Sequence, residues 1–350
     1  MSDTQSPALD QNGVIRVRRS THSPIYTLVG ASILIVLLSV APWIVPAEFA
    51  TTLMNFFILV IMATMWNLLA GYAGMVSIGQ QAFVGLGAYA TLYFALKGMN
   101  PFVTIPFAAL ACGVIAYPVT LLLFRLRGGY FSIATWVVAD TAMLIIGTIA
   151  VLGGGTGRLM PGLQNLSPSE TAHFSYLATW VVALVVVVGT YVLLRSRLGL
   201  VLSAIRDNEV AARSAGANVR AARRTVFILA AAGCGAAGAV LAISQPFIQP
   251  SNEFNMQWAA EMLFVSMIGG LGTIEGPIIG SIIFFVLQQT LQQEGVWYLV
   301  IFGTFAVAVA LWQPRGLWGA FRDRFHSELL PVGHWVEGPK GKKRTRTGKS

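Results

Sequence analysis

Long apolar blocks, separated by short polar segments, run through most of this chain of 350 residues and limit the folds open to it. Hydrophobic residues make up 55% of the sequence and charged residues only 11%, less than half the share of roughly 25% that is usual in a globular protein. That is too little charge to cover a soluble fold of this size. Because about 20 apolar residues in a helix cross roughly 30 Å of hydrocarbon, the blocks predict an all-α polytopic membrane protein.

About ten of these blocks are candidate transmembrane helices, some of them short or broken by glycine. The first is expected to stay uncleaved, since the polar segment before it is long and mixed in charge for the n-region of a signal peptide. The predicted spans are residues 25–45, 52–70, 80–97, 101–124, 130–151, 173–194, 223–247, 257–271, 276–293 and 296–312.

The basic residues predict the orientation of the spans. If the N-terminus is cytoplasmic and the spans alternate, only Lys97 and Arg158 of the 23 lysines and arginines lie outside, as the positive-inside rule requires. We therefore expect an even number of spans with both termini cytoplasmic. The chain then divides into an N-terminal tail (1–24), a transmembrane domain (25–318) with one long inner loop (195–224), and a basic C-terminal tail (319–350) that attracts anionic membrane lipid.

Composition and spacing also argue against several classes of function. The net charge is +9, but the basic residues lie between apolar segments and not on one amphipathic face, so no nucleic-acid partner is expected. Cys112 and Cys234 fall inside apolar segments, where small packing residues are expected. The histidines show no metal-ligand spacing, and no catalytic cluster is visible. We expect no metal, no cofactor and no enzyme activity in this chain.

The inner loop carries the clearest signal for a partner. Residues 203–215 are predicted to form one helix that ends near Gly216 and Asn218, which suit left-handed backbone angles. A stripe of small residues at helical spacing fits closely into a groove on another protein, whereas a solvated connector, the alternative, needs no such stripe. The stripe consists of Ala204, Asn208, Ala211, Ala212 and Ala215, and Arg206, Asp207, Glu209 and Arg213 flank it.

Two glycine-rich segments interrupt the apolar pattern. Such glycines either allow close helix packing or let the backbone unwind beside a cavity. Ser77, Gln80 and Gln81 in the first segment favour a polar translocation path, because uncharged polar groups in hydrocarbon need partners or water. The recurrence in the second half also hints at internal pseudo-symmetry. The glycines are Gly71, Gly74, Gly79, Gly85 and Gly87 in the first segment and Gly269, Gly270, Gly272 and Gly276 in the second.

Two acidic residues fall inside predicted spans, where a charge is costly and therefore marks function by default. They are Asp140 and Glu261, and no lysine or arginine lies at comparable depth to pair with either. Both are expected to face the interior of the bundle and to bond to hydroxyls, backbone or water there. A place on the translocation path and a purely structural role both remain open.

Four motifs together resemble the LivM-like permeases of branched-chain amino acid ABC importers. They are G-Y-A-G-x-x-S-x-G-x-x-x-F-x-G-x-G-A-Y (71–89), A-I-R-D-N-E-x-A-A-R-S-A-G (204–216), G-G-L-G-T-x-x-G-P-x-x-G (269–280) and P-R-G-L (314–317). The resemblance runs from about residue 50 to 318. It implies a subunit of the bacterial inner membrane that pairs with a second, LivH-like permease, two cytoplasmic ATPase subunits that bind ATP and magnesium, and a periplasmic substrate-binding protein.

The same resemblance assigns a role to the inner loop. Residues 203–216, including Arg206 and Asp207, would be the coupling helix that docks on the ATPases. Glu209, Ala211, Ala212 and Gly216 correspond to the importer motif E-A-A-x-x-x-G, although Val210 intervenes between the glutamate and the alanines.

The substrate and the energy source have alternatives. Gln80-Gln81 stands where His-Ala is often found, and the outer loop 153–166 matches only loosely, so urea, short amides and monosaccharides remain alternative solutes. A secondary transporter with Asp140 or Glu261 as its ion site is the main alternative mechanism, although a gradient-driven carrier has no motor that would dock on the inner loop.

Overall fold

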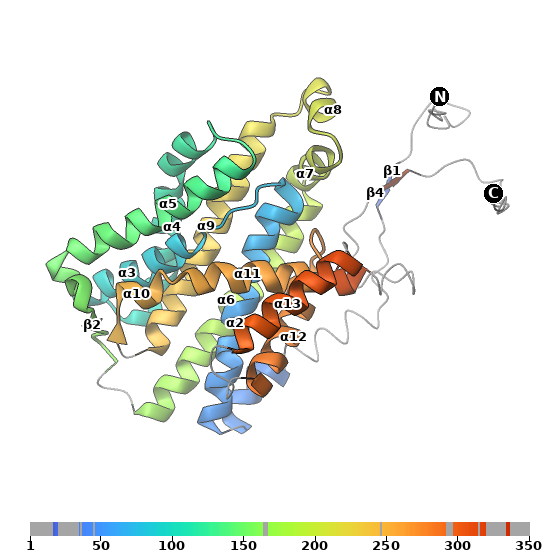
Figure 1. Ribbon diagram of the computed structural model, residues 1–350. Coiled ribbons are helices and arrows are strands. Elements are labelled where there is room, and N and C mark those ends of the chain that lie inside the picture. The colour runs from blue at the N-terminus through green and yellow to red at the C-terminus, as the bar shows by residue number, and fades with distance from the viewer. Residues whose placement is uncertain are drawn as a thin grey trace, which may run out of the picture.

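The computed structural model describes residues 17–19, 35, 37–44, 46–163, 167–245, 247–291, 297–313, 316–319 and 334–336. These form a bundle of helices that cross one another at varied angles, with the segments 17–19 and 334–336 together at one side of it (Figure 1). The predicted residues 25–34, the junction 292–296, Pro314 and Arg315 of the P-R-G-L motif, and nearly all of the tail 319–350 lie outside the described residues.

Helices account for most of the described chain, and residues 37–44 are also helical. The helix α2 continues without a break into a π-helical turn, Leu68–Tyr72. The helices are α2 (Ala47–Asn67), α3 (Gln81–Leu96), α4 (Pro101–Leu123), α5 (Gly129–Thr148), α6 (Pro168–Arg195), α7 (Arg197–Asp207), α8 (Glu209–Ser214), α9 (Val219–Ser244), α10 (Pro250–Glu253), α11 (Met256–Gly269), α12 (Glu275–Leu291) and α13 (Trp297–Trp312). Each of the ten predicted spans overlaps a helical segment in its described part.

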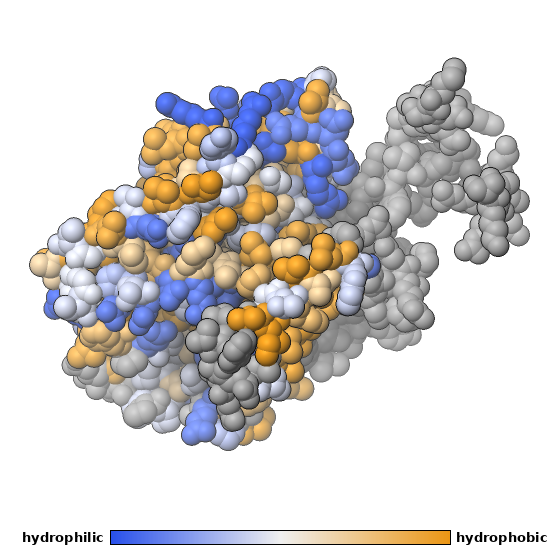
Figure 2. All heavy atoms as spheres, viewed as in Figure 1, coloured by the Kyte–Doolittle hydropathy of each residue, from blue (hydrophilic) through white to orange (hydrophobic). Residues whose placement is uncertain are grey.

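Five helices in the described part of the chain are long and apolar enough to cross a membrane. They are Glu48–Tyr72, Pro101–Leu123, Gly129–Thr148, Ser169–Arg195 and Val219–Ser244. Hydrophilic residues gather at the end of the molecule that carries α7 and α8 (Figure 2). The prediction of a helical, multi-pass membrane protein is confirmed.

Two short pairs of strands depart from the all-α prediction. The strand β1 (Val17–Arg19) pairs antiparallel with β4 (His334–Val336), so segments near the two ends of the chain lie together. The strand β2 (Arg158–Leu159) pairs antiparallel with β3 (Phe247–Ile248) and joins the loop after α5 to the loop after α9. Pairs of two or three residues were too short to leave a periodic pattern in the sequence.

Local sequence explains where several helices begin. Ser167 and Glu170 form a capping box at the start of α6, in which each side chain bonds to the backbone N–H of the other residue. Asn100 caps α4, and its side chain accepts a hydrogen bond from the N–H of Phe102 over 3.0 Å. Pro101 follows as the first helical residue, where its missing N–H costs nothing.

The helix α9 is the centre of the core and packs against α2, α3, α4 and α6. Small residues let its neighbours approach closely, since a Cβ on Gly87 of α3 would overlap the carbonyl oxygen of Gly235, and a Cβ on Gly235 would lie 2.6 Å from the Cys112 sulfur. Cys112 and Cys234 are both free thiols buried in this core. Their predicted packing role is confirmed.

Candidate functional site

The inner loop folds as two helices and not as the single helix predicted for residues 203–215. The backbone at Asn208 is extended (φ −159°, ψ 105°), which separates α7 from α8. Its side-chain oxygen accepts a hydrogen bond from the N–H of Ala211 over 3.0 Å and caps α8. Asparagine favours such caps over helix interiors because its side chain competes for backbone N–H groups. The prediction of one continuous helix is wrong for this reason.

The small-residue stripe is divided by that break. Ala212 is buried in the core, while Ala204, Ala211 and Ala215 are exposed. The most prominent apolar side chain on α8 is Val210, which is 76% exposed. The exposed surface at this end of the inner loop is therefore the short helix α8 with Val210 on its outside, and not a stripe that continues through Asn208 into α7.

The predicted stop at Gly216 is confirmed, but the role expected of Asn218 is wrong. Gly216 has a left-handed backbone (φ +87°), and the N–H of Ala217 donates to the carbonyl of Ala212 over 3.0 Å, closing the end of α8. Asn218 instead caps the next helix, because its side chain accepts a hydrogen bond from the N–H of Ala221 at the start of α9.

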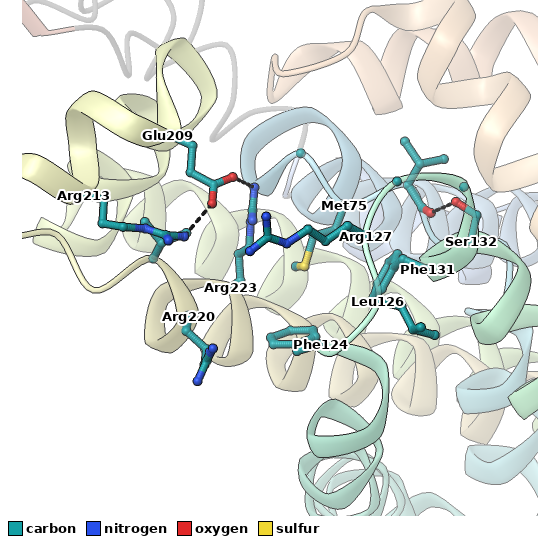
Figure 3. A pocket seen from close by; sticks show the side chains of 15 residues that line it. Met75, Phe124, Leu126, Arg127, Phe131, Ser132, Glu209, Arg213, Arg220 and Arg223 are labelled. Atoms are coloured by element: carbon teal, nitrogen blue, oxygen red, sulfur yellow. Dashed lines mark hydrogen bonds and ion pairs between the residues drawn. The ribbon is translucent and has the colours of Figure 1, made fainter.

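Glu209 joins α8 to the base of α9. One carboxylate oxygen lies 2.8 Å from Nη2 of Arg213, one turn along α8, and the other lies 3.0 Å from Nη2 of Arg223 in α9. The Nε–H of Arg223 also donates to the carbonyl of Ala73 over 3.1 Å, just after the π-helical turn. A single arginine, whose ion pair with Glu209 is drawn in Figure 3, thus connects the end of the inner loop to the first glycine-rich segment.

The segment 73–80, which we call the connector, is fixed on its other side to α5. The N–H of Ile78 donates to Oγ1 of Thr135 over 3.1 Å, and Oγ of Ser132 donates to the carbonyl of Val76 over 2.6 Å. Gly79 lies against the same helix, with no room for a side chain beside the carbonyl oxygen of Thr135. The connector therefore has contacts with α9 at one end and with α5 at the other.

The two glycine-rich segments lie in direct contact. Asn67 binds the second segment with both groups of its side chain, donating to the carbonyl of Thr273 over 2.7 Å and accepting from the N–H of Gly272 over 2.9 Å. A Cβ on Gly71 would overlap the backbone nitrogen of Gly272. These glycines serve close packing, one of the two roles predicted for them.

The other predicted glycines occupy similar places. Gly85 lies under the ring of Phe254, Gly269 and Gly276 lie against each other, and Gly270 has a positive φ of 129°. Gly74, with φ +66°, is different, because the nearest heavy atom to an added Cβ is 3.9 Å away, on Arg223.

The polar residues predicted for a path are packed inside this subunit. Ser77, Gln80 and Gln81 are completely buried, and Nε2 of Gln80 donates to Oγ of Ser77 over 3.3 Å. Within the described part of the chain, Oε1 of Gln80 and both polar atoms of Gln81 have no hydrogen-bond partner. Their place on a translocation path stays a prediction.

The two intramembrane carboxylates differ in position. Glu261 is only 5% exposed and accepts a hydrogen bond from Gln257 over 2.8 Å, as an interior position requires. Asp140 is exposed on the outer face of α5, next to the exposed side chains of Val137 and Leu144. The expectation that Asp140 faces the interior of the bundle is wrong, because apolar residues lie on every side of α5 and its sequence does not reveal which face packs.

Arg206 and Asp207 lie at the end of α7, beside the second glycine-rich segment. Both are exposed, and Nε of Arg206 is 3.9 Å from the Asp207 carboxylate. A Cβ on Gly272 would lie 2.7 Å from Nη1 of Arg206. The end of α7 and the second glycine-rich segment are therefore adjacent.

A cavity of about 520 Å³ lies between α8, α9, the connector and the turn between α4 and α5. Four arginines and one glutamate line it, together with backbone of the Gly128-Gly129 turn (Figure 3). The charged residues are Arg127, Glu209, Arg213, Arg220 and Arg223. Sequence analysis missed the cavity because Arg127 and Arg213 belong to different loops, with two predicted spans between them.

Another feature that the sequence did not reveal is the position of Glu253, in the short helix α10. It is completely buried, and neither carboxylate oxygen has a partner among the described residues. Tyr89 of α3 is close enough to interact with it electrostatically, and the Tyr89 hydroxyl is also without a partner there. Burial raises the pKa of the Glu253 carboxyl to about 7, because desolvation disfavours the charged form.

This shift predicts a pH-dependent effect of Glu253→Gln. The pKa is higher in the folded chain than the ordinary value of 4.5, so the stability contributed by the protonated form is complete below pH 4.5 and is lost as pH rises through about 7. The variant removes a cost of up to roughly 3 kcal/mol at high pH. We expect the variant to melt at a higher temperature than the wild type at pH 8, and the difference between the two melting temperatures to be smaller at pH 5. Glu48→Gln, at an exposed glutamate, is the control, and a gap that does not change with pH would contradict the prediction.

Comparison with known proteins identifies the family of this chain. The family described as "Branched-chain amino acid transport system / permease component" matches residues 49–310, which include α8, the connector and both glycine-rich segments. This chain belongs to that permease family. The resemblance inferred from the four motifs is confirmed.

Three curated relatives show how far the similarity extends. The high-affinity branched-chain amino acid transport system permease protein LivM of Escherichia coli K12 is 27% identical over 284 residues, which cover 72% of this chain and 65% of that protein. The probable permease protein LivH of Methanocaldococcus jannaschii is 24% identical over 65% of this chain and 74% of its own length. The ribose import permease protein RbsC of Escherichia coli K12 is 29% identical over 38% of this chain and 43% of its own length. No solved structure matches.

Proposed function

We propose that this permease-family chain is one membrane subunit of an ATP-driven importer for branched-chain or closely related small amino acids. The observation that carries the proposal is the ion pair of Glu209 with Arg223, which connects the exposed helix α8 to the connector. ATP and magnesium would bind to two separate cytoplasmic ATPase subunits, so that this chain itself is not an enzyme. The names of the LivM relatives support the substrate class.

The contacts suggest how work at α8 would act inside the membrane. A displacement of α8 by an ATPase would move the Glu209 carboxylate and with it the Arg223 guanidinium. Because Arg223 holds the carbonyl of Ala73, and the connector holds Thr135 and Ser132, the displacement would continue to α5. Alternating access would follow from a movement of α5 relative to the rest of the bundle.

The outer face of α5 is the place we propose for the companion, LivH-like permease. Asp140 lies near the middle of this face among exposed apolar side chains, and a carboxylate facing lipid there is costly. Contact with a second permease, or with a polar path between the two, would provide the hydrogen-bond donors that lipid lacks. A periplasmic binding protein would deliver the substrate at the opposite end from α8.

The topology we propose has ten spans within residues 25–318, with both tails in the cytoplasm of a bacterium and the bundle in its inner membrane. The pairing of β1 with β4 supports an even number of spans, because two paired strands must lie on the same side of a bilayer. Helices of 14 to 17 residues, such as α11 and α12, would cross only part of the hydrocarbon or require it to thin.

A docking experiment tests the proposal. Val210→Asp places a charge on the most exposed apolar side chain of α8 and is expected to weaken co-purification of the ATPase subunits of the same importer by about tenfold, which corresponds to roughly 1.4 kcal/mol. Val151→Asp is the control, since Val151 is similarly exposed (64%) but follows α5 at the other end of the molecule. Equal recovery of the ATPases with both variants would refute docking on α8.

The main alternative is a carrier driven by an ion gradient, with Glu261 or Asp140 as its ion site. Uptake by the purified chain alone in liposomes, driven by a proton or sodium gradient and without ATP, would favour this alternative. The partial similarity to the ribose permease makes a monosaccharide the alternative solute within the ATP-driven class, and competition between labelled leucine and ribose in uptake assays separates the two.

A further inference from the structure

The lining of the cavity beside α8 has more positive than negative charge. Among the described residues that line it, Glu209 is the only acidic one, and both oxygens of that carboxylate are taken by Arg213 and Arg223. Arg127 and Arg220 line the same cavity and, in the part of the chain that the structure describes, have no hydrogen-bond or ion-pair partner. Two arginines that line the cavity are therefore available to an anion.

The position of the cavity indicates which molecule would cover it. Glu209 and Arg213 belong both to its wall and to α8, so a protein that docks on α8 also covers the mouth of the cavity. Covering Arg127 and Arg220 without an anion would remove two charges from water without compensation, which is strongly unfavourable. A docked protein must therefore bring negative groups to this position or bind poorly.

We propose that the ATPase subunit which docks on α8 inserts acidic side chains into this cavity, where their carboxylates bind Arg127 and Arg220. This inference rests on the proposed function and adds the chemistry of the partner surface. A guanidinium binds a carboxylate through two parallel hydrogen bonds. Only Gly128 separates Arg127 from the start of α5, so the contact adds a second attachment from the ATPase to α5, independent of the connector.

An anionic phospholipid headgroup is the competing occupant. Hydrophilic residues gather at the end of the molecule that carries α7 and α8 (Figure 2). The cavity is lined there by residues of α8 itself and of the start of α9. These observations favour the protein carboxylate. The lipid becomes one outcome of the test.

The experiment compares two double variants of the full chain in nanodiscs of neutral lipid, and a parallel set uses nanodiscs that also contain anionic lipid. Arg127→Gln with Arg220→Gln removes the two free charges of the cavity, while Arg125→Gln with Arg197→Gln removes two exposed arginines that do not line it. The affinity for the purified ATPase subunits of the same importer is measured at low and high salt. We expect the first pair to weaken binding about tenfold at low salt and to flatten its salt dependence, and the second pair to change neither.

Three other outcomes are informative. Equal affinities for both double variants would overturn the proposal while leaving docking on α8 intact. A loss of binding that appears only when anionic lipid is present would assign the cavity to a headgroup and also overturn it. If the wild-type chain does not bind the ATPases, the proposed function fails and this inference fails with it. A third variant, Arg127→Lys with Arg220→Lys, keeps the charge and should retain most of the affinity, which separates a charge effect from misfolding.

Discussion

A Glu209→Leu variant should lose most of its substrate uptake while it still inserts into the membrane and still folds. Leucine removes both ion pairs, so α8 is no longer attached to Arg223 and the movement of an ATPase no longer acts on the connector. A coupling free energy between two sites is typically about 1–3 kcal/mol, or roughly 5–150-fold. Uptake and substrate-stimulated ATP hydrolysis, measured in the assembled importer, are expected to decrease by a factor within this range.

Two companion variants define what the Glu209 result means. Glu48→Leu changes an exposed glutamate in the first turn of α2, outside the inner loop, and it should transport normally. Gly216→Val should behave like Glu209→Leu, because φ of +87° is strained for valine although the space around the residue is open. Full uptake and full stimulated hydrolysis in both Glu209→Leu and Gly216→Val would show that α8 has no coupling role.

Gly79→Ala should damage the protein more than any other single methyl addition to the connector. The added Cβ would overlap the carbonyl oxygen of Thr135 and lie 2.9 Å from the Thr135 Cβ. Both atoms are held by the backbone of α5 and have little freedom to move away. Forcing extra volume into a packed site costs about 1–3 kcal/mol. The variant is expected to melt several degrees lower and to transport poorly, since the connector is displaced from α5.

The matched control for Gly79→Ala is Gly147→Ala in α5 itself. A Cβ on Gly147 meets no heavy atom of the described chain within 4 Å, and alanine favours a helix over glycine by up to about 1 kcal/mol. Gly147→Ala should therefore melt at or above the wild-type temperature. If both variants melt at the same temperature, the close contact between the connector and α5 does not exist in the protein.

The positions of the helices could be predicted because the length and spacing of apolar blocks depend on the sequence alone. The direction in which a helix faces could not be predicted in the same way. Large apolar residues lie on every side of α5, so its sequence does not show that the side with Thr135 packs and the side with Asp140 is exposed. Orientation depends on the neighbours that the fold supplies, and the interior position expected for Asp140 was wrong for that reason.

Contacts between distant segments also escaped prediction. Asn67 joins the two glycine-rich segments across a sequence separation of 206 residues, and only their composition, not their contact, was visible in the sequence. Glu253 lies in a helix of four residues that leaves no periodic pattern. Its one local signal was an acidic residue between two predicted spans, with Pro250 at the start of a turn and Phe254 directly after it.

The outward position of Asp140 affects how such a chain is made as well as how it works. A newly inserted copy exposes this carboxylate to acyl chains until another protein covers it, at an insertion cost of roughly 2.5–3.5 kcal/mol if it lies near the bilayer centre. Under the proposed pairing, each unassembled copy carries that penalty, and contact with the companion permease removes it. Asp140, which we assign to the contact between permeases, would therefore make the isolated subunit short-lived. The cell would then need to synthesise the two permeases of the importer in matched amounts.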